Sequence, residues 1–113
     1  MSVEDKNTVD AFSITPEGKV RLLISDHLEW DQENKHLLTL QEKINTYLRV
    51  IESGEIYEVY PQSEGKEFII QIMMKYSPNE TALEFLNRVE GMLDKAGYEF
   101  QYRYFDPEEL NYT

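Results

Sequence analysis

One amphipathic segment, between residues 32 and 53, constrains the fold of this chain more than any other stretch. Its apolar side chains recur every three or four residues, as on one face of an α-helix. They are Leu37, Leu40, Ile44, Tyr47, Leu48 and Ile51. The residues off this face are Gln41, Glu42, Lys43 and Arg49. The pattern therefore predicts a long helix whose off-face side chains, Lys43 included, point into water.

Both ends of this helix carry local signals. Asp31, Glu33 and Asn34 precede it, and acidic or capping side chains there satisfy the unpaired N–H groups of a helix N-terminus. Gly54 follows it, and glycine adopts the left-handed conformation that ends a helix without a Cβ clash. These signals place the helix at about residues 32–53.

Five short segments have the composition of strands, at residues 9–14, 19–26, 55–60, 66–76 and 98–105. The first two are joined by Thr15-Pro16-Glu17-Gly18, which fits a type I turn closing a hairpin. Apolar residues on both faces of residues 66–76 predict that this strand is central in the sheet.

A second helix follows the central strand. Ser77 is expected as its N-cap, with Pro78 at the first helical position and Glu80 completing a capping box. Gly97 is expected to end it. Gly91 lies inside, where glycine costs roughly 1 kcal/mol relative to alanine, so we expect a close approach to a neighbouring element there.

The predicted element order is β-β-α-β-β-α-β. Short turns favour antiparallel pairing, and two one-sided helices can cover one face of a sheet. We therefore expect an α+β two-layer sandwich with a mainly antiparallel sheet and both helices on one face. A single domain is expected over residues 1–113, with residues 1–7 and 106–113 as flexible tails.

The charge balance limits the function classes. The chain has 22 acidic and 11 basic residues, a net charge of −11, and no cysteine. Nucleic-acid binding requires clustered Lys and Arg, so we expect no nucleic-acid partner. No apolar run is long enough for a membrane span and no signal peptide is recognisable, so a cytoplasmic protein without a membrane partner is expected. The absence of cysteine excludes disulfides and thiolate metal sites.

Asp26, His27, Glu29 and His36 form the one cluster with acid–base or metal-binding character. A catalytic histidine would need an orienting carboxylate, and a metal would need three or more converging ligands. The spacing matches no known motif, and adjacent Asp26 and His27 point to opposite faces of a strand. We expect a structural role, with no catalytic residue, no cofactor and no metal site. A small hydrolase or metal-assisted enzyme using Asp26, His27 and His36 is the alternative.

The aromatic residues leave two interpretations open. Trp30 precedes the long helix, where it either fixes the start of the helix to the core or serves as an exposed binding anchor. Tyr57 and Tyr60 would suit a protein interface if they lie outside the core. The alternating aromatics Tyr98, Phe100, Tyr102 and Tyr104 resemble a base-stacking platform. The net charge instead favours burial of that row under the helices.

The segment DHLEW at residues 26–30, followed by HLLTLQEKINTYLRVIESGEI at residues 36–56, resembles an uncharacterised family of small acidic bacterial proteins, a domain of unknown function. The resemblance extends over about residues 9–105. It implies a bacterial, cytosolic context, and it supplies no catalytic or binding residue.

These observations together predict a non-enzymatic, acidic protein-interaction domain. It would bind and neutralise or regulate a basic protein partner, as small immunity proteins do, with Trp30, Tyr57 and Tyr60 as interaction candidates. The short strands at residues 9–14 and 55–60 are expected at sheet edges, which favours a homodimer.

Overall fold

The computed structural model describes residues 3, 9–31 and 35–104. The predicted tails at residues 1–7 and 106–113 therefore lie almost entirely outside the described residues. The elements in chain order are β1 (Ala11–Ile14), β2 (Val20–Asp26), α1 (Lys35–Glu52), α2 (Glu55–Val59), the 3₁₀ helix η1 (Pro61–Ser63), β3 (Phe68–Met74), α3 (Glu80–Lys95) and β4 (Glu99–Tyr104). The α+β class is confirmed. Within the described residues, no helix is both long and apolar enough to cross a membrane.

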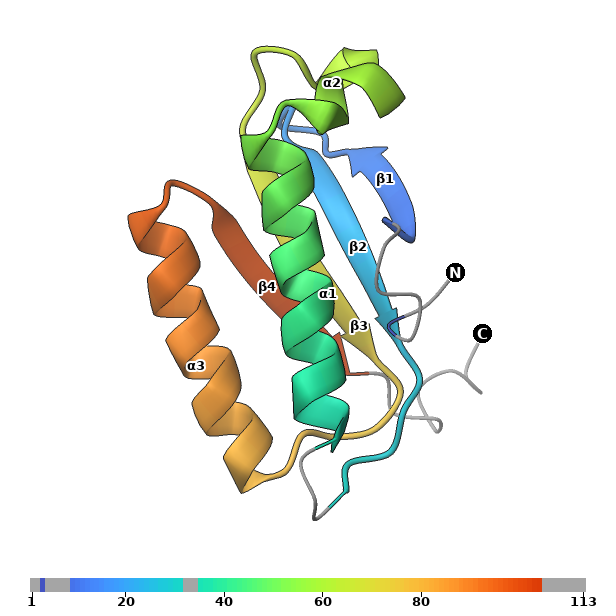
Figure 1. Cartoon of the computed structure of the whole chain (residues 1–113), viewed down its shortest axis with the longest axis vertical. Helices are drawn as coiled ribbons and strands as arrows, with labels where there is room; N and C mark the ends of the chain where they lie inside the picture. The colour runs from blue at the N-terminus through green and yellow to red at the C-terminus, as the bar shows by residue number, and fades with distance from the viewer. Residues whose placement is uncertain (1–2, 4–8, 32–34, 105–113) are drawn as a thin grey trace.

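The sheet has four strands in the order β1-β2-β3-β4 (Figure 1). Only β1 and β2 pair antiparallel, while β2–β3 and β3–β4 pair parallel. The prediction of a mainly antiparallel sheet is therefore wrong. The reason is that a helix returns the chain between β2 and β3, and another between β3 and β4, and such a crossover brings the next strand in parallel.

The segment at residues 55–60, predicted as a strand, is mostly the short helix α2. Only Ile56 of α2 is buried, so α2 is fixed to the core by one side chain. The central strand β3 already has a partner on each side: β2 pairs with residues 68–74 of β3, and β4 pairs with residues 69–74. No position beside β3 is therefore left for residues 55–60.

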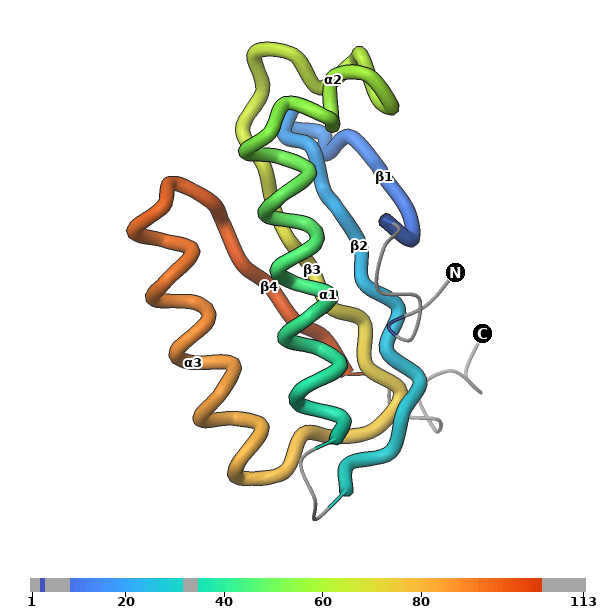
Figure 2. The backbone as a smooth tube through the Cα atoms, viewed as in Figure 1, coloured from blue at the N-terminus to red at the C-terminus, as the bar shows by residue number. Residues whose placement is uncertain are grey.

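Helices α1 and α3 lie side by side on one face of the sheet (Figure 1), and both strand–helix–strand connections cross that face (Figure 2). The prediction of two helices on one face is thus correct for α1 and α3. The core between the layers combines the inward residues of β2 and β3 with the apolar faces of the helices. Its fully buried members include Val20, Leu22, Ile24, Leu40, Tyr47, Ile70, Ile72 and Leu86.

The aromatic row of β4 belongs mainly to this core. Phe100 is buried, and Tyr98 and Tyr102 are partly buried against the core. Phe100 and Tyr102 pair with Ile70 and Ile72, so they share the helix-covered face of the sheet. Tyr104 is exposed at the end of the strand. The expected burial of the row under the helices therefore holds as far as Tyr102.

Helix termini follow the sequence signals in part. Gly54 and Gly97 have φ values of 83° and 91°, as expected of glycines that end helices. The N-cap of α3 is Asn79 and not Ser77, because the Asn79 side chain accepts a hydrogen bond from the Ala82 N–H. Gly91 has no atom within 4 Å of the position that a Cβ would occupy, so the expected close approach is wrong.

The largest departure from the predicted pattern is Lys43, which was expected in water and is 0% exposed. Its ammonium group lies 2.8 Å from Asp10 Oδ1, so the two side chains form a buried ion pair. Asp10 Oδ2 accepts a hydrogen bond from the Ser25 N–H. Helical periodicity classes lysine as a polar, solvent-facing residue. It contains no information about Asp10, whose buried carboxylate compensates the charge of Lys43.

Candidate functional site

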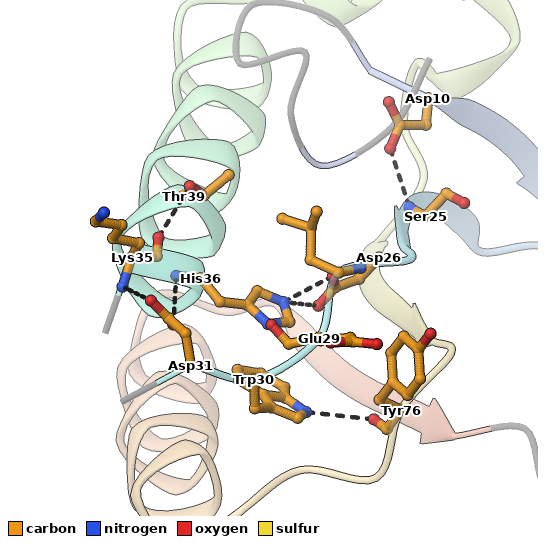
Figure 3. Close-up of polar contacts among 11 residues, drawn as sticks. Asp10, Ser25, Asp26, Glu29, Trp30, Asp31, Lys35, His36, Thr39 and Tyr76 are labelled. Carbon is orange, nitrogen blue, oxygen red and sulfur yellow. Dashed lines mark hydrogen bonds and ion pairs between the residues drawn. The ribbon is translucent and has the colours of Figure 1, made fainter. Parts of the chain in front are cut away.

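The structure brings together two of the three residues that the enzyme alternative requires. Asp26 is the last residue of β2 and His36 lies in the first turn of α1. Their side chains meet where the chain passes from the strand to the helix (Figure 3). His36 Nε2 lies 2.7 Å from Asp26 Oδ1 and 2.6 Å from Oδ2. Their side chains are 3% and 0% exposed. The pair is therefore a closed contact inside the molecule.

The hydrogen bonds of the imidazole place its protons. Nδ1 lies 3.1 Å from the backbone carbonyl oxygen of Glu29, which only accepts, so Nδ1 carries a proton. Nε2 faces a carboxyl group, so another proton lies between the two residues. It resides on Nε2 as an imidazolium facing a carboxylate, or on Asp26 as a carboxylic acid facing a neutral ring. Asp26 Oδ1 also accepts from the Leu28 N–H at 3.2 Å.

Trp30 completes this arrangement, which we call the Asp26–His36–Trp30 cluster. Its ring stacks on the His36 ring with centroids 3.7 Å apart and an interplanar angle of 19°. Its Nε1–H donates to the Tyr76 carbonyl oxygen at 3.3 Å, which links the loop to the segment after β3 (Figure 3). Trp30 is partly buried against the core. It therefore lies where the sequence predicted a residue that fixes the start of the helix.

Asp31 caps the same end of α1. Its Oδ1 accepts from the His36 N–H at 3.1 Å and its Oδ2 from the Lys35 N–H at 3.0 Å. The hydrogen bond from the His36 N–H holds the pKa of Asp31 below its ordinary value. The capping role predicted for Asp31 is confirmed, while Glu33 and Asn34 lie outside the described residues.

The cluster does not offer the geometry of an open catalytic or metal site. His27 is exposed while its neighbour Asp26 is buried, so the structure does not bring all three candidates together. Asp26 and His36 line none of four grooves on the surface of the described residues, among them a groove between the two long helices. Among these residues, no three His, Cys, Asp or Glu side chains converge to hold a metal ion. The cluster ties β2, α1 and the segment after β3 together.

The two tyrosine candidates lie near the opposite end of α1, where Tyr57 is part of α2 and Tyr60 follows it directly. Tyr57 is 40% exposed and its ring is tilted against Phe68 with centroids 6.5 Å apart. Tyr60 is partly buried and stacks on Phe12 of β1, with centroids 5.0 Å apart and an interplanar angle of 8°. Tyr60 therefore fixes α2 to the edge of the sheet, and Tyr57 is the tyrosine that reaches the surface.

The surface at α2 combines exposed apolar side chains with exposed glutamates. Val59 is 58% exposed and lies two residues after Tyr57. Residues 55–64 contain Glu55, Glu58 and Glu64, and neither Lys nor Arg. We call the exposed side chains Glu55, Tyr57, Glu58, Val59 and Glu64 the α2 surface.

A groove on the face of the sheet away from the helices was not anticipated from the sequence. Its volume is about 640 Å³. Alternate residues of β2, β3 and β4 line it: Arg21, Leu23, Gln71, Met73, Gln101 and Arg103. We call it the far-face groove. The sequence shows one or two polar residues among these alternate positions of each strand, namely Arg21, Gln71, Gln101 and Arg103. These positions form a groove only because the three strands are neighbours in the sheet.

A groove also separates the two long helices. It is lined by Ile44 of α1 and by Phe85, Val89 and Met92 of α3, with Arg88 at its side. Its volume is about 250 Å³. Met92 is 57% exposed, so this groove has an apolar rim.

Comparison with known proteins gives one finding. The model of a family of unknown function, DUF6572, matches residues 1–106. Neither the curated proteins nor the solved structures include a significant match to the chain.

Proposed function

Since the chain belongs to this family of unknown function, we propose from its geometry that it is a protein-interaction domain whose α2 surface binds a basic protein partner. The observation that carries the proposal is the coincidence of exposed Tyr57 and Val59 with three glutamates and no basic residue in residues 55–64. Tyrosine is enriched among residues that dominate interface energies, and surrounding charge selects the partner.

The net charge supports the same partner class. At −11, the whole chain attracts a positively charged protein and repels acidic ones. Charge of this kind raises the rate of encounter, while the exposed aromatic and aliphatic groups supply contact area. A complementary partner would present Lys or Arg side chains around an apolar patch.

The catalytic alternative has weaker support. Asp26 and His36 form a proton-sharing pair, but both are closed to solvent, whereas His27 is exposed. General acid–base catalysis requires that a substrate atom come within hydrogen-bond reach of the catalytic group. In the described structure both ring nitrogens of His36 already have partners, Nε2 in Asp26 and Nδ1 in the Glu29 carbonyl oxygen, and Trp30 covers one face of the ring.

Photo-crosslinking in the cells that produce the protein tests the proposal. A photoreactive phenylalanine analogue replaces Tyr57 in one variant and Leu83, an equally exposed residue of α3, in a control. We expect a basic protein to be crosslinked from position 57 and not from position 83. The same protein should lose crosslinking when Glu55 and Glu58 are replaced by glutamine.

Binding measurements with that purified partner complete the test. Tyr57→Ala should weaken binding at least tenfold, as at an interface hot spot, while Leu83→Ala should leave it unchanged. Higher salt should also weaken binding. Equal crosslinking from both positions, or a crosslinked partner that is acidic, would contradict the proposal.

A further inference from the structure

The far-face groove is positively charged on an acidic protein. Arg21 of β2 and Arg103 of β4 are its charged lining residues, and none of its lining residues is Asp or Glu. Among the described residues, neither arginine forms an ion pair, and Arg21 Nε is buried without a hydrogen-bond partner. Arginine presents donors in a fork that matches a carboxylate, so these two groups are unused anion-binding capacity.

The strand register sets the distance between the two arginines. Arg21 pairs with Ile69 of β3, and Arg103 pairs with Met73, four residues further along β3. Four residues along a strand and two strands across place their Cα atoms roughly 16 Å apart. The arginines therefore stand at diagonal corners of the groove.

The floor between the arginines is a row of neutral side chains. Leu23, Gln71 and Gln101 are consecutive partners across β2, β3 and β4, with Met73 beside them. Gln71 is almost completely buried, at 5% exposure. An apolar and amide floor between two cations fits a ligand with an apolar body and an acceptor at each end.

The carboxylate of Glu99, two residues before Gln101 on β4, already has two partners. Glu99 Oε1 accepts from Lys19 Nζ at 3.0 Å, and Glu99 Oε2 accepts from the Gln101 amide. The hydrogen bond from Lys19 holds the pKa of Glu99 below its ordinary value, with a smaller contribution from the charge of Arg21. The overall charge of −11 acts weakly at this site, because charges beyond about 8–10 Å are largely screened at physiological salt.

We propose that the far-face groove binds a small dianionic molecule in which an apolar body separates two carboxylates, one held by Arg21 and the other by Arg103. The volume of about 640 Å³ lies within the range of small-molecule sites. This proposal does not depend on the proposed function, because the residues that line the groove and those of the α2 surface have no member in common.

A titration of the isotope-labelled chain with suberate, a linear dicarboxylate, tests the proposal by NMR. We expect saturable shifts of the Arg21 Nε–H and of the Gln71 and Gln101 amides, and none on the exposed face of α3. Octane-1,8-diol, an uncharged linear molecule with the same number of carbon atoms, should produce no such shifts. Octanoate, with one carboxylate, should bind at least tenfold more weakly than suberate.

Three variants test whether Arg21 and Arg103 bind the carboxylates of suberate. Arg21→Gln and Arg103→Gln should each weaken suberate binding at least tenfold, whereas Arg49→Gln removes the same charge from the exposed surface of α1 and should not change it. Unchanged thermal unfolding of each variant separates lost binding from lost fold.

Four results would overturn the proposal: no shifts with suberate at millimolar concentration, equal binding of octanediol, equal loss in Arg49→Gln, or inorganic phosphate binding as tightly as suberate. The last result would indicate a general anion site. Shifts that extend along the groove only with an acidic peptide would indicate a macromolecular ligand instead.

Discussion

Lys43 Nζ lies 2.8 Å from Asp10 Oδ1, and the two side chains are 0% and 3% exposed. Tyr47, one turn further along α1, accepts a hydrogen bond from the Asp10 N–H and donates one to the Leu23 carbonyl oxygen. Burial raises the pKa of Tyr47 well above its ordinary value, so the phenol remains a donor at physiological pH. These contacts join α1 to the segment before β1 and to β2.

Replacing Lys43 by methionine should lower the free energy of unfolding by about 3–5 kcal/mol, because removing one partner leaves the Asp10 charge buried and uncompensated. Urea denaturation measures the loss. Arg49→Met, on the exposed side of the same helix, should change it by less than about 0.5 kcal/mol. The double variant Asp10→Asn with Lys43→Met should recover part of the loss. Equal stability of the two single variants at positions 43 and 49 would show that the ion pair contributes little.

Trp30→Ala should cost about 2–3 kcal/mol, below the range for a fully buried tryptophan, because Trp30 is only partly buried. Trp30→Phe keeps a ring to stack on His36 but loses the hydrogen bond to the Tyr76 carbonyl, so it should cost about 1 kcal/mol. Circular dichroism during urea denaturation measures both variants without the tryptophan signal. A Trp30→Ala variant as stable as the parent would indicate that the stacked ring does not fix the start of α1.

The lowered pKa of Asp31 predicts that the folded chain loses stability in acid. Its pKa in the folded chain is lowered by the His36 N–H, so its stabilising effect is complete above the unfolded value of about 3.9 and disappears as the pH falls through the lower folded value. The stability difference between the parent and Asp31→Asn should therefore be constant near neutral pH and shrink below about pH 4. Glu29→Gln, an exposed change in the same loop, should show no such trend. A difference independent of pH would rule out this role for the Asp31 charge.

Gly91→Ala should stabilise the protein by roughly 0.5–1 kcal/mol, because the position is exposed, helical and without a neighbour within 4 Å of a Cβ. Gly97→Ala should destabilise it, since Gly97 has a φ of 91° that alanine adopts only with strain. Thermal unfolding of both variants compares the two positions directly. Destabilisation by Gly91→Ala would reveal a constraint on α3 that the described contacts do not contain.

Self-association remains a prediction. The edge strand predicted at residues 9–14 is confirmed as β1, whereas the one predicted at residues 55–60 is wrong, because most of that segment is the helix α2. Among the described residues, β1 and β4 each have a strand partner on one side only, and β4 is the longer edge. Pairing of two copies through β4 would give twice the chain mass of 13.4 kDa by light scattering. Tyr104→Lys should shift the mass toward one chain, because charge on an exposed edge opposes pairing. A parent chain that scatters as a monomer would exclude the dimer.

The sequence alone was sufficient to predict the helix and turn features that depend on residues close together in the chain. The apolar stripe of α1 buries Leu40, Ile44, Tyr47 and Ile51, and Gly54 adopts the left-handed conformation that ends it. The hairpin of β1 and β2 closes at the predicted turn, where the Gly18 N–H donates to the Thr15 carbonyl oxygen. Each of these features depends on residues a few positions apart, so periodicity, capping and turn chemistry describe them directly.

The candidate sites depended on contacts between distant positions. Asp26 was a correct candidate partner for His36, but only the fold of the loop decides that the pair is closed under Trp30 and separated from exposed His27. Lys43 is buried because Asp10, which precedes β1, reaches it. The far-face groove exists because Arg21 of β2 and Arg103 of β4 lie on the same face of the sheet, with β3 between their strands. Local propensity sets which residues form helices and strands. Tertiary structure decides strand partners and buried charge pairs, because their energies depend on groups brought together across the chain.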